Sequence, residues 1–125
     1  MLIEINTLAQ MVDTMILPAC YSYHGLLADA AAKAKTAGIS TIPQIDAANE
    51  VGALIEQLRE RRKTLGDAIA KAEHEHESVD ACAKLLTGPG ADAMASVRAT
   101  CDALELIVGD EFWPLPKYRE ILFPV

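Results

Sequence analysis

Apolar residues recur along the first third of the chain at spacings of three, four or seven, which place them on one side of an α-helix. This pattern predicts a helix from about residue 3 to residue 35, capped at its end by Gly38. Pro18 lacks a backbone N–H and crowds the preceding turn, so we expect a kink near residues 13–15 or a break into two helices. The apolar positions are Ile5, Leu8, Val12, Met15, Ala19, Leu26 and Ala30.

A longer helical pattern follows a short link. Thr41, Pro43 and Gln44 have the spacing of a capping box, with Thr41 as the N-cap. Steps of three and four then continue over about 44 residues, which predicts a long central helix. The segment Gly88-Pro89-Gly90 is expected to end this helix as a turn. The stripe consists of Ala48, Val51, Ile55, Leu58, Arg62, Leu65, Ile69, Ala72, His76, Val79, Ala83 and Leu86.

A third helix is expected to begin at Asp92, a favourable N-cap residue, and to end at Gly109. Pro114 and Pro116 in the tail forbid a continuous helix there. Short links place neighbouring helices antiparallel, and no strand pattern is present. We therefore predict one all-α domain over residues 1–125: an elongated antiparallel three- or four-helix bundle with a long central helix and a short aromatic, Pro-containing C-terminal tail. The third stripe is Met94, Val97, Cys101, Leu104 and Val108.

Charge and cysteine content narrow the possible partners and compartment. The 125 residues carry a net charge of −7, and an acidic surface disfavours binding to nucleic acid or to anionic membranes. No apolar run reaches the roughly 20 residues that span a bilayer, and the N-terminus lacks the basic segment of a secretion signal. Cys20, Cys82 and Cys101 form no CxxC, which favours free, mostly buried thiols in a cytoplasmic protein over a redox pair.

The usual catalytic and cofactor motifs are absent from the sequence, so we predict no catalytic, cofactor-binding or metal residues. His74 and His76 are two apart on a helix and point about 200° from each other, so they are poorly placed to chelate one ion. An exposed acidic stretch is the favoured interpretation of this segment. A metal-sensing bundle built on the two histidines is the alternative.

Two smaller features have structural interpretations. The basic cluster at residues 59–63 lies close to Glu56 and Glu60, which favours a salt-bridged helix face over an anion or nucleic-acid site. His24, beside Tyr21 and Tyr23, is expected to pack at the core or its rim rather than to line a catalytic pocket.

The aromatic residues of the tail are too many to bury within so slim a bundle. They either cap one end of it or dock on something larger, because aromatic residues are enriched at interfaces. The candidate interface consists of Phe112, Trp113, Tyr118 and Phe123.

Both ends of the chain carry recognisable motifs. Residues 13–19 read DTMILPA, and residues 111–123 read EFWPLPKYREILF. These segments resemble the C-terminal region of type III glutamine synthetases, in which a helix bearing ILPA follows the catalytic domain and the chain ends in a similar WPLP-x-Y-R-E-x-L-F signature. A helix like that of residues 101–108 precedes the signature in the family. The order and spacing of the pieces match over nearly all of the chain.

The resemblance implies a non-catalytic C-terminal helical domain of a larger ATP-dependent glutamate–ammonia ligase, active in nitrogen assimilation. The metal-binding carboxylates, the nucleotide site and the ammonium site of the family lie upstream, so ATP and Mg²⁺ belong to the full-length enzyme and no catalytic residue is carried over. The expected partners are the catalytic domain and neighbouring subunits of a ring assembly. The alternative is a freestanding helical protein-binding module that grips a partner with its tail or long helix.

Overall fold

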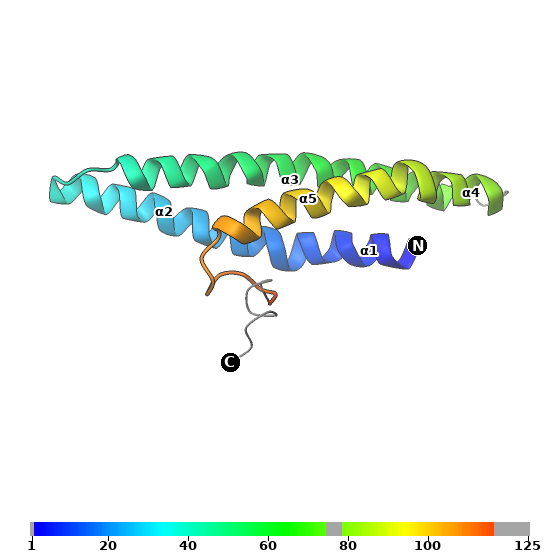
Figure 1. Ribbon diagram of the computed structural model, residues 1–125, viewed down its shortest axis with the longest axis horizontal. Helices are drawn as coiled ribbons and strands as arrows, with labels where there is room; N and C mark the ends of the chain where they lie inside the picture. The colour runs from blue at the N-terminus through cyan, green and yellow to red at the C-terminus, as the bar shows by residue number, and fades with distance from the viewer. Residues whose placement is uncertain (1, 75–78, 117–125) are drawn as a thin grey trace.

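The computed structural model describes residues 2–74 and 79–116, which form three helices and a short tail (Figure 1). No strand occurs in these two ranges, and the prediction of an all-α chain is confirmed. Two of the three helices include a π-helical segment, labelled η. The first is α1 (Leu2–Met11), η1 (Val12–Ile16) and α2 (Leu17–Ala37); the second is α3 (Ile42–His74); the third is α4 (Val79–Leu85), η2 (Leu86–Gly90) and α5 (Ala91–Ile107).

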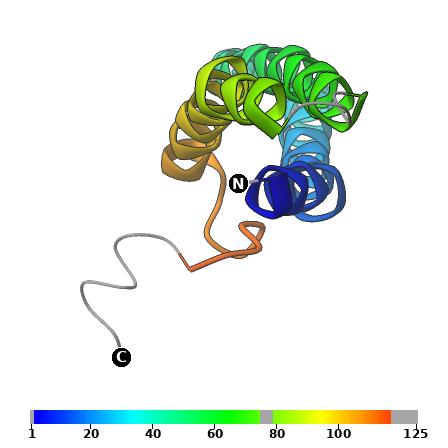
Figure 2. The same cartoon turned by 90° about the vertical axis from the view of Figure 1, so that its right-hand side faces the viewer.

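The long helix α3 is the centre of the structure. Viewed end-on, the first helix and α5 lie to either side of it (Figure 2). At about 1.5 Å per residue, its 33 residues extend for about 50 Å. The core lies where the three helices meet, and its largest fully buried side chains are Ile5, Leu58, Leu65, Leu104, Val12, Val51, Val97 and Val108.

The first helix passes Pro18 without a break. The disturbance predicted near residues 13–15 takes the form of η1, the π-helical segment that directly precedes α2 and its Pro18. A π turn holds an extra residue, so the side chains beyond it reach the core one position later. Cys20 is therefore fully buried where Ala19 was expected, and the prediction is wrong for Leu26, which is 48% exposed.

The predicted end of α2 is confirmed. Gly38 adopts the left-handed conformation with φ 74° and ψ 21°, which glycine reaches at no steric cost. Its N–H donates to the carbonyl of Lys35 and that of Ile39 donates to the carbonyl of Ala34. The helix α3 begins directly after Thr41, as predicted, and the Thr41 carbonyl accepts from the N–H of Ile45 at 3.0 Å. The side chain that accepts from the N–H of Ile42, at 3.3 Å, is that of Ser40.

The Gly88-Pro89-Gly90 segment is not a turn, and the prediction that it ends the long helix is wrong. Pro89 lies inside η2, and Gly90 has the right-handed helical angles φ −65° and ψ −46°. The helix therefore continues into α5, and Asp92 lies within α5 rather than capping it. The helix needs a glycine at position 90 because there is no room for a side chain. A Cβ on Gly90 would lie 3.0 Å from the carbonyl oxygen of Leu85 and 3.2 Å from Cδ1 of Ile5.

The predicted long central helix is divided between two described helices that pack against each other. The helix α3 ends at His74, and the next described helix, α4, packs against α3. The Cys82 thiol lies 3.5 Å from the carbonyl oxygen of Ala72, which joins α4 to the end of α3.

The predicted apolar stripes of the second and third helices are confirmed over most of their length. The buried residues of α3 are Val51, Ile55, Leu58, Leu65, Ile69 and Ala72, all of them predicted; His76 lies outside the described residues. In the third helix and directly after it, Met94, Val97, Cys101, Leu104 and Val108 are all buried.

In the part of the chain that the structure describes, no helix is both long enough and apolar enough to cross a bilayer.

Candidate functional site

Two adjacent arginines of α3 bind to different neighbouring helices. Consecutive helical residues point about 100° apart, so Arg61 and Arg62 can reach two different neighbours of α3. Arg61 Nη1 donates to the carbonyl of Ser96 at 3.0 Å and to Oγ1 of Thr100 at 2.7 Å, both on α5. Thr100 is only 1% exposed, and its own hydroxyl donates to the Ser96 carbonyl at 3.1 Å. Arg61 therefore supplies a charged donor to a buried hydroxyl.

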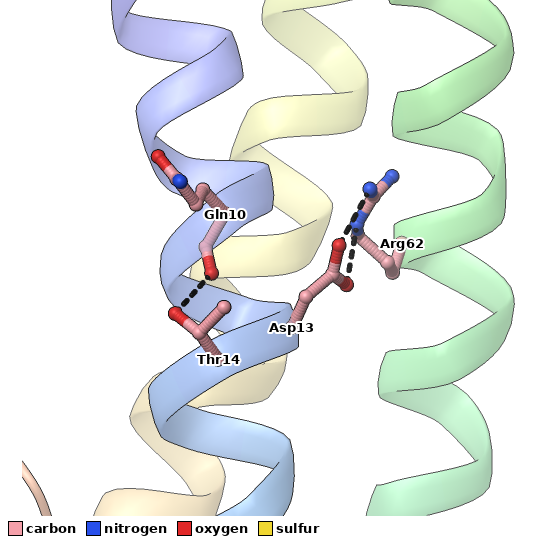
Figure 3. A network of polar contacts seen from close by, with 4 residues as sticks. All are labelled: Gln10, Asp13, Thr14 and Arg62. Atoms are coloured by element: carbon pink, nitrogen blue, oxygen red, sulfur yellow. Dashed lines mark hydrogen bonds and ion pairs between the residues drawn. The ribbon is translucent and has the colours of Figure 1, made fainter.

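Arg62 forms a two-pronged ion pair with Asp13 of η1 (Figure 3). Its Nε donates to Oδ1 and its Nη2 to Oδ2, each at 2.9 Å. This parallel geometry is the strong form of the arginine–carboxylate contact. On the next residue of η1, the Thr14 hydroxyl donates to the carbonyl of Gln10 at 2.7 Å. The ion pair thus joins the π-helical segment to the central helix.

The ion pair lies in an open groove of about 500 Å³ between the first helix and α3. Gly66 makes room for the guanidinium, since a Cβ there would lie 3.0 Å from Nη1 of Arg62. The amide of Asn6 donates to the carbonyl of Leu2, as Thr14 does to that of Gln10. Both of these bonds lie within the first helix, whereas the ion pair joins that helix to α3. The groove is lined by Asn6, Ala9, Gln10, Asp13, Thr14, Arg62, Gly66, Ile69, Ala70 and Glu73.

The sequence could not identify the partners of the basic cluster. We expected Glu56 and Glu60, one helical turn away, whereas the carboxylate that binds Arg62 belongs to another helix. Asp13 and Arg62 are 49 residues apart, and no local spacing rule connects them.

Substitutions at Arg62 and Asp13 test how much this ion pair contributes to the stability of the fold. Arg62→Ala is expected to lower the free energy of unfolding by about 0.5–1 kcal/mol, because the pair is partly exposed to solvent. The double exchange Asp13→Arg with Arg62→Asp should recover part of that loss, whereas each single reversal should not. Urea unfolding followed by circular dichroism measures the effect, with the exposed Arg59→Ala as control. Equal losses in Arg59→Ala and Arg62→Ala would contradict this role.

The three cysteines are free, as predicted, with Cys20 and Cys101 buried and Cys82 half-buried. Burial raises the pKa of Cys20 from 9.0 to about 11, with a further contribution from Cys101. Burial likewise raises the pKa of Cys101 to about 11, with a further contribution from Asp102. Both thiols are protonated at neutral pH, and because the thiolate is the nucleophile, they are poorly reactive core residues.

The histidines within the described residues have separate environments. His24 is half-buried against α3, with its Nε2 3.2 Å from the position that a Cβ on Gly52 would occupy; the prediction of rim packing is confirmed. His74 is exposed at the end of α3, and His76 lies outside the described residues. Within residues 2–74 and 79–116, no three His, Cys, Asp or Glu side chains are grouped to hold a metal ion.

The start of the aromatic tail packs on the bundle. The N–H of Phe112 donates to the carbonyl of Gly109 at 2.9 Å, and that of Trp113 to the carbonyl of Asp110 at 3.3 Å, so two turns fold the tail back. Trp113 is 9% exposed and belongs to the core. Phe112 lies against Tyr23 of α2, with ring centroids 5.5 Å apart and planes inclined by 56°. Of the candidate interface, Tyr118 and Phe123 lie outside the described residues.

Comparison with known proteins finds similarity over almost the whole chain. A type-3 glutamine synthetase from Dictyostelium discoideum is 32% identical over 127 aligned residues, which cover 97% of this chain. This chain is similar to a region of a glutamine synthetase. A glutamine synthetase from Bacteroides fragilis is 57% identical over 30 residues, or 24% of the chain.

The similarity covers a small part of each relative. The chain spans 17% of the Dictyostelium protein, and the shorter alignment spans 4% of the Bacteroides protein. No family model matches the chain. No solved structure matches it either.

Proposed function

We propose that this chain is a non-catalytic helical part of a type-3 glutamine synthetase, an ATP-dependent glutamate–ammonia ligase. The observation that carries the proposal is the alignment, which covers 97% of this chain but only 17% of the relative. Glutamate, ammonia, ATP and Mg²⁺ then bind to the rest of the enzyme. The role of this part is to pack against the catalytic portion or between subunits.

The chemistry of the described residues supports a structural role. Arg61 and Arg62, two of the cationic side chains at the centre of α3, each bind a neighbouring helix. Burial keeps the thiols of Cys20 and Cys101 protonated at neutral pH. These arginines therefore hold the helices together, and these thiols are poorly reactive.

The aromatic tail is the proposed contact with the rest of the enzyme. Trp113 is buried in the core and attaches the tail to the bundle, while Phe112 is half-buried on Tyr23. In this proposal Phe112, Tyr118 and Phe123 are the residues of the candidate interface that contact the catalytic portion or a neighbouring subunit. Aromatic residues suit such a contact because they bury a large apolar area.

A chimeric enzyme tests the proposal. The matching region of the Dictyostelium synthetase is replaced by this chain, and glutamine formation and assembly are measured by a coupled assay and by sedimentation velocity. The chimera should keep its kcat and its assembly, whereas deletion of the region should impair assembly or thermal stability. The chain by itself should form no glutamine.

Two results would contradict the proposal. Turnover by the chain alone would show that it carries catalytic residues. A deletion variant that assembles normally but has lost the chemical step would place the region in the active site rather than at a packing surface.

A further inference from the structure

A part of α2 and α3 extends beyond the end of α5 as a two-helix arm (Figure 1). We define the arm as residues 21–50, which include the end of α2, the turn at Gly38 and the start of α3. The tail contacts the arm near its base, at Tyr23. Within the arm, Ala34 is the one residue that is buried, at 4% exposure. Two helices alone therefore leave the arm with almost no core.

The arm also holds most of the exposed large apolar side chains. Among the described residues, seven such side chains are exposed, and five of them belong to the arm. A helical hairpin buries one side of each helix, and helical bundles cover the remaining apolar surface with further helices. The arm therefore has exposed apolar side chains on both of its helices that another pair of helices could cover. The five residues are Tyr21 at 47% exposure, Leu26 at 48%, Ile39 at 63%, Ile42 at 67% and Ile45 at 45%.

The charges on the arm indicate what can cover it. The α2 part carries Lys33 and Lys35 against Asp29, which leaves one net positive charge, and the α3 part carries Asp46 and Glu50, which leave two negative charges. All five side chains are exposed. The arm thus contributes only one net negative charge to a chain of net charge −7, so the net charge of two arms opposes their contact only weakly.

We propose that the arm pairs with the arm of a second copy of this chain, so that α2 of each copy lies beside α3 of the other. A two-fold arrangement brings together the same surface of both copies and places the positive helix of one against the negative helix of its partner. The four helices then bury the isoleucines of both tips in a common core. This inference depends on the surface of the arm alone and does not rest on the relation to glutamine synthetases.

The oligomeric state of the chain tests the apolar part of this proposal. Sedimentation equilibrium over a range of protein concentrations should show a monomer–dimer equilibrium. Ile42→Glu with Ile45→Glu should weaken dimerisation by about tenfold or more, because the dimer would bury unpaired carboxylates. The control is Leu106→Glu, because Leu106 is 86% exposed on α5 and lies outside the arm. This variant should leave dimerisation unchanged. Circular dichroism checks that each variant stays folded.

Mixing two charge variants tests the orientation of the helices. Lys33→Glu with Lys35→Glu makes both helices of the arm negative, and Asp46→Lys with Glu50→Lys makes both positive. Each variant alone should dimerise about tenfold more weakly than the original chain, since like charges then face each other. An equal mixture of the two should form a heterodimer with recovered affinity.

Three results would overturn the proposal. If the chain stays monomeric at the highest concentration measured, its arm does not pair with a second copy. A dimer that is unaffected by the substitutions at Ile42 and Ile45 uses another surface. A mixture that dimerises no better than its components contradicts the pairing of α2 with the partner's α3.

Discussion

Replacing Trp113 with alanine is expected to lower the free energy of unfolding by about 3 kcal/mol, the usual cost of removing a large buried aromatic side chain. Trp113 is 9% exposed and packs in the same core as the residues of the three helices. Its loss leaves a cavity and removes the main attachment of the tail. Phe112 is then expected to lose its contact with Tyr23, because the turns at Gly109 and Asp110 no longer hold the ring in place.

The measurement uses urea unfolding followed by circular dichroism. Trp113→Phe is the matched control, and we expect it to cost about 1 kcal/mol, because it keeps an aromatic ring and most of the buried volume. Trp113 is the only tryptophan, so its fluorescence in the original chain reports directly on the docked tail. Emission typical of a solvated indole in the folded chain, or an alanine variant as stable as the original, would contradict the burial of this residue.

Replacing Gly90 with alanine is expected to lower the free energy of unfolding by about 2 kcal/mol, in the range for overpacking a tight site. The new Cβ would lie 3.0 Å from the carbonyl oxygen of Leu85 and 3.2 Å from Cδ1 of Ile5. The first of these atoms is backbone and the second belongs to a fully buried side chain, so neither can move freely. The expected result is a helix that is displaced from α1 at this point.

Gly88→Ala is the matched control for this substitution. Apart from its chain neighbours and the backbone of its own helix, no atom lies within 4 Å of a Cβ at Gly88, and alanine favours a helix over glycine by about 1 kcal/mol, which offsets the crowding of a Cβ by the following Pro89. We therefore expect Gly88→Ala to be neutral or stabilising in urea and thermal unfolding. If both variants behaved alike, Gly88-Pro89-Gly90 would not be the packed helical segment of the structure.

Several elements of the fold could be predicted because they depend on neighbouring residues only. The stripe of α3 from Val51 to Ala72 follows from the 3.6-residue period, and the end of α2 follows from the glycine at position 38. The disturbance ahead of Pro18 follows from a missing N–H. The aromatic tail was identified as a candidate interface from composition alone, but whether Trp113 packs on its own bundle could not be judged without the position of the bundle.

The sequence by itself determined that the chain is helical, which side chains of α3 and α5 face the core, and where α2 ends, because helical period and capping are set within a few residues. Only the tertiary structure decided that Gly88-Pro89-Gly90 continues a helix, that α4 packs against α3, and that Arg61 and Arg62 bind Thr100 and Asp13. These outcomes depend on contacts between segments far apart in the chain, such as Gly90 against Ile5. The energies of these contacts arise only when the helices pack together.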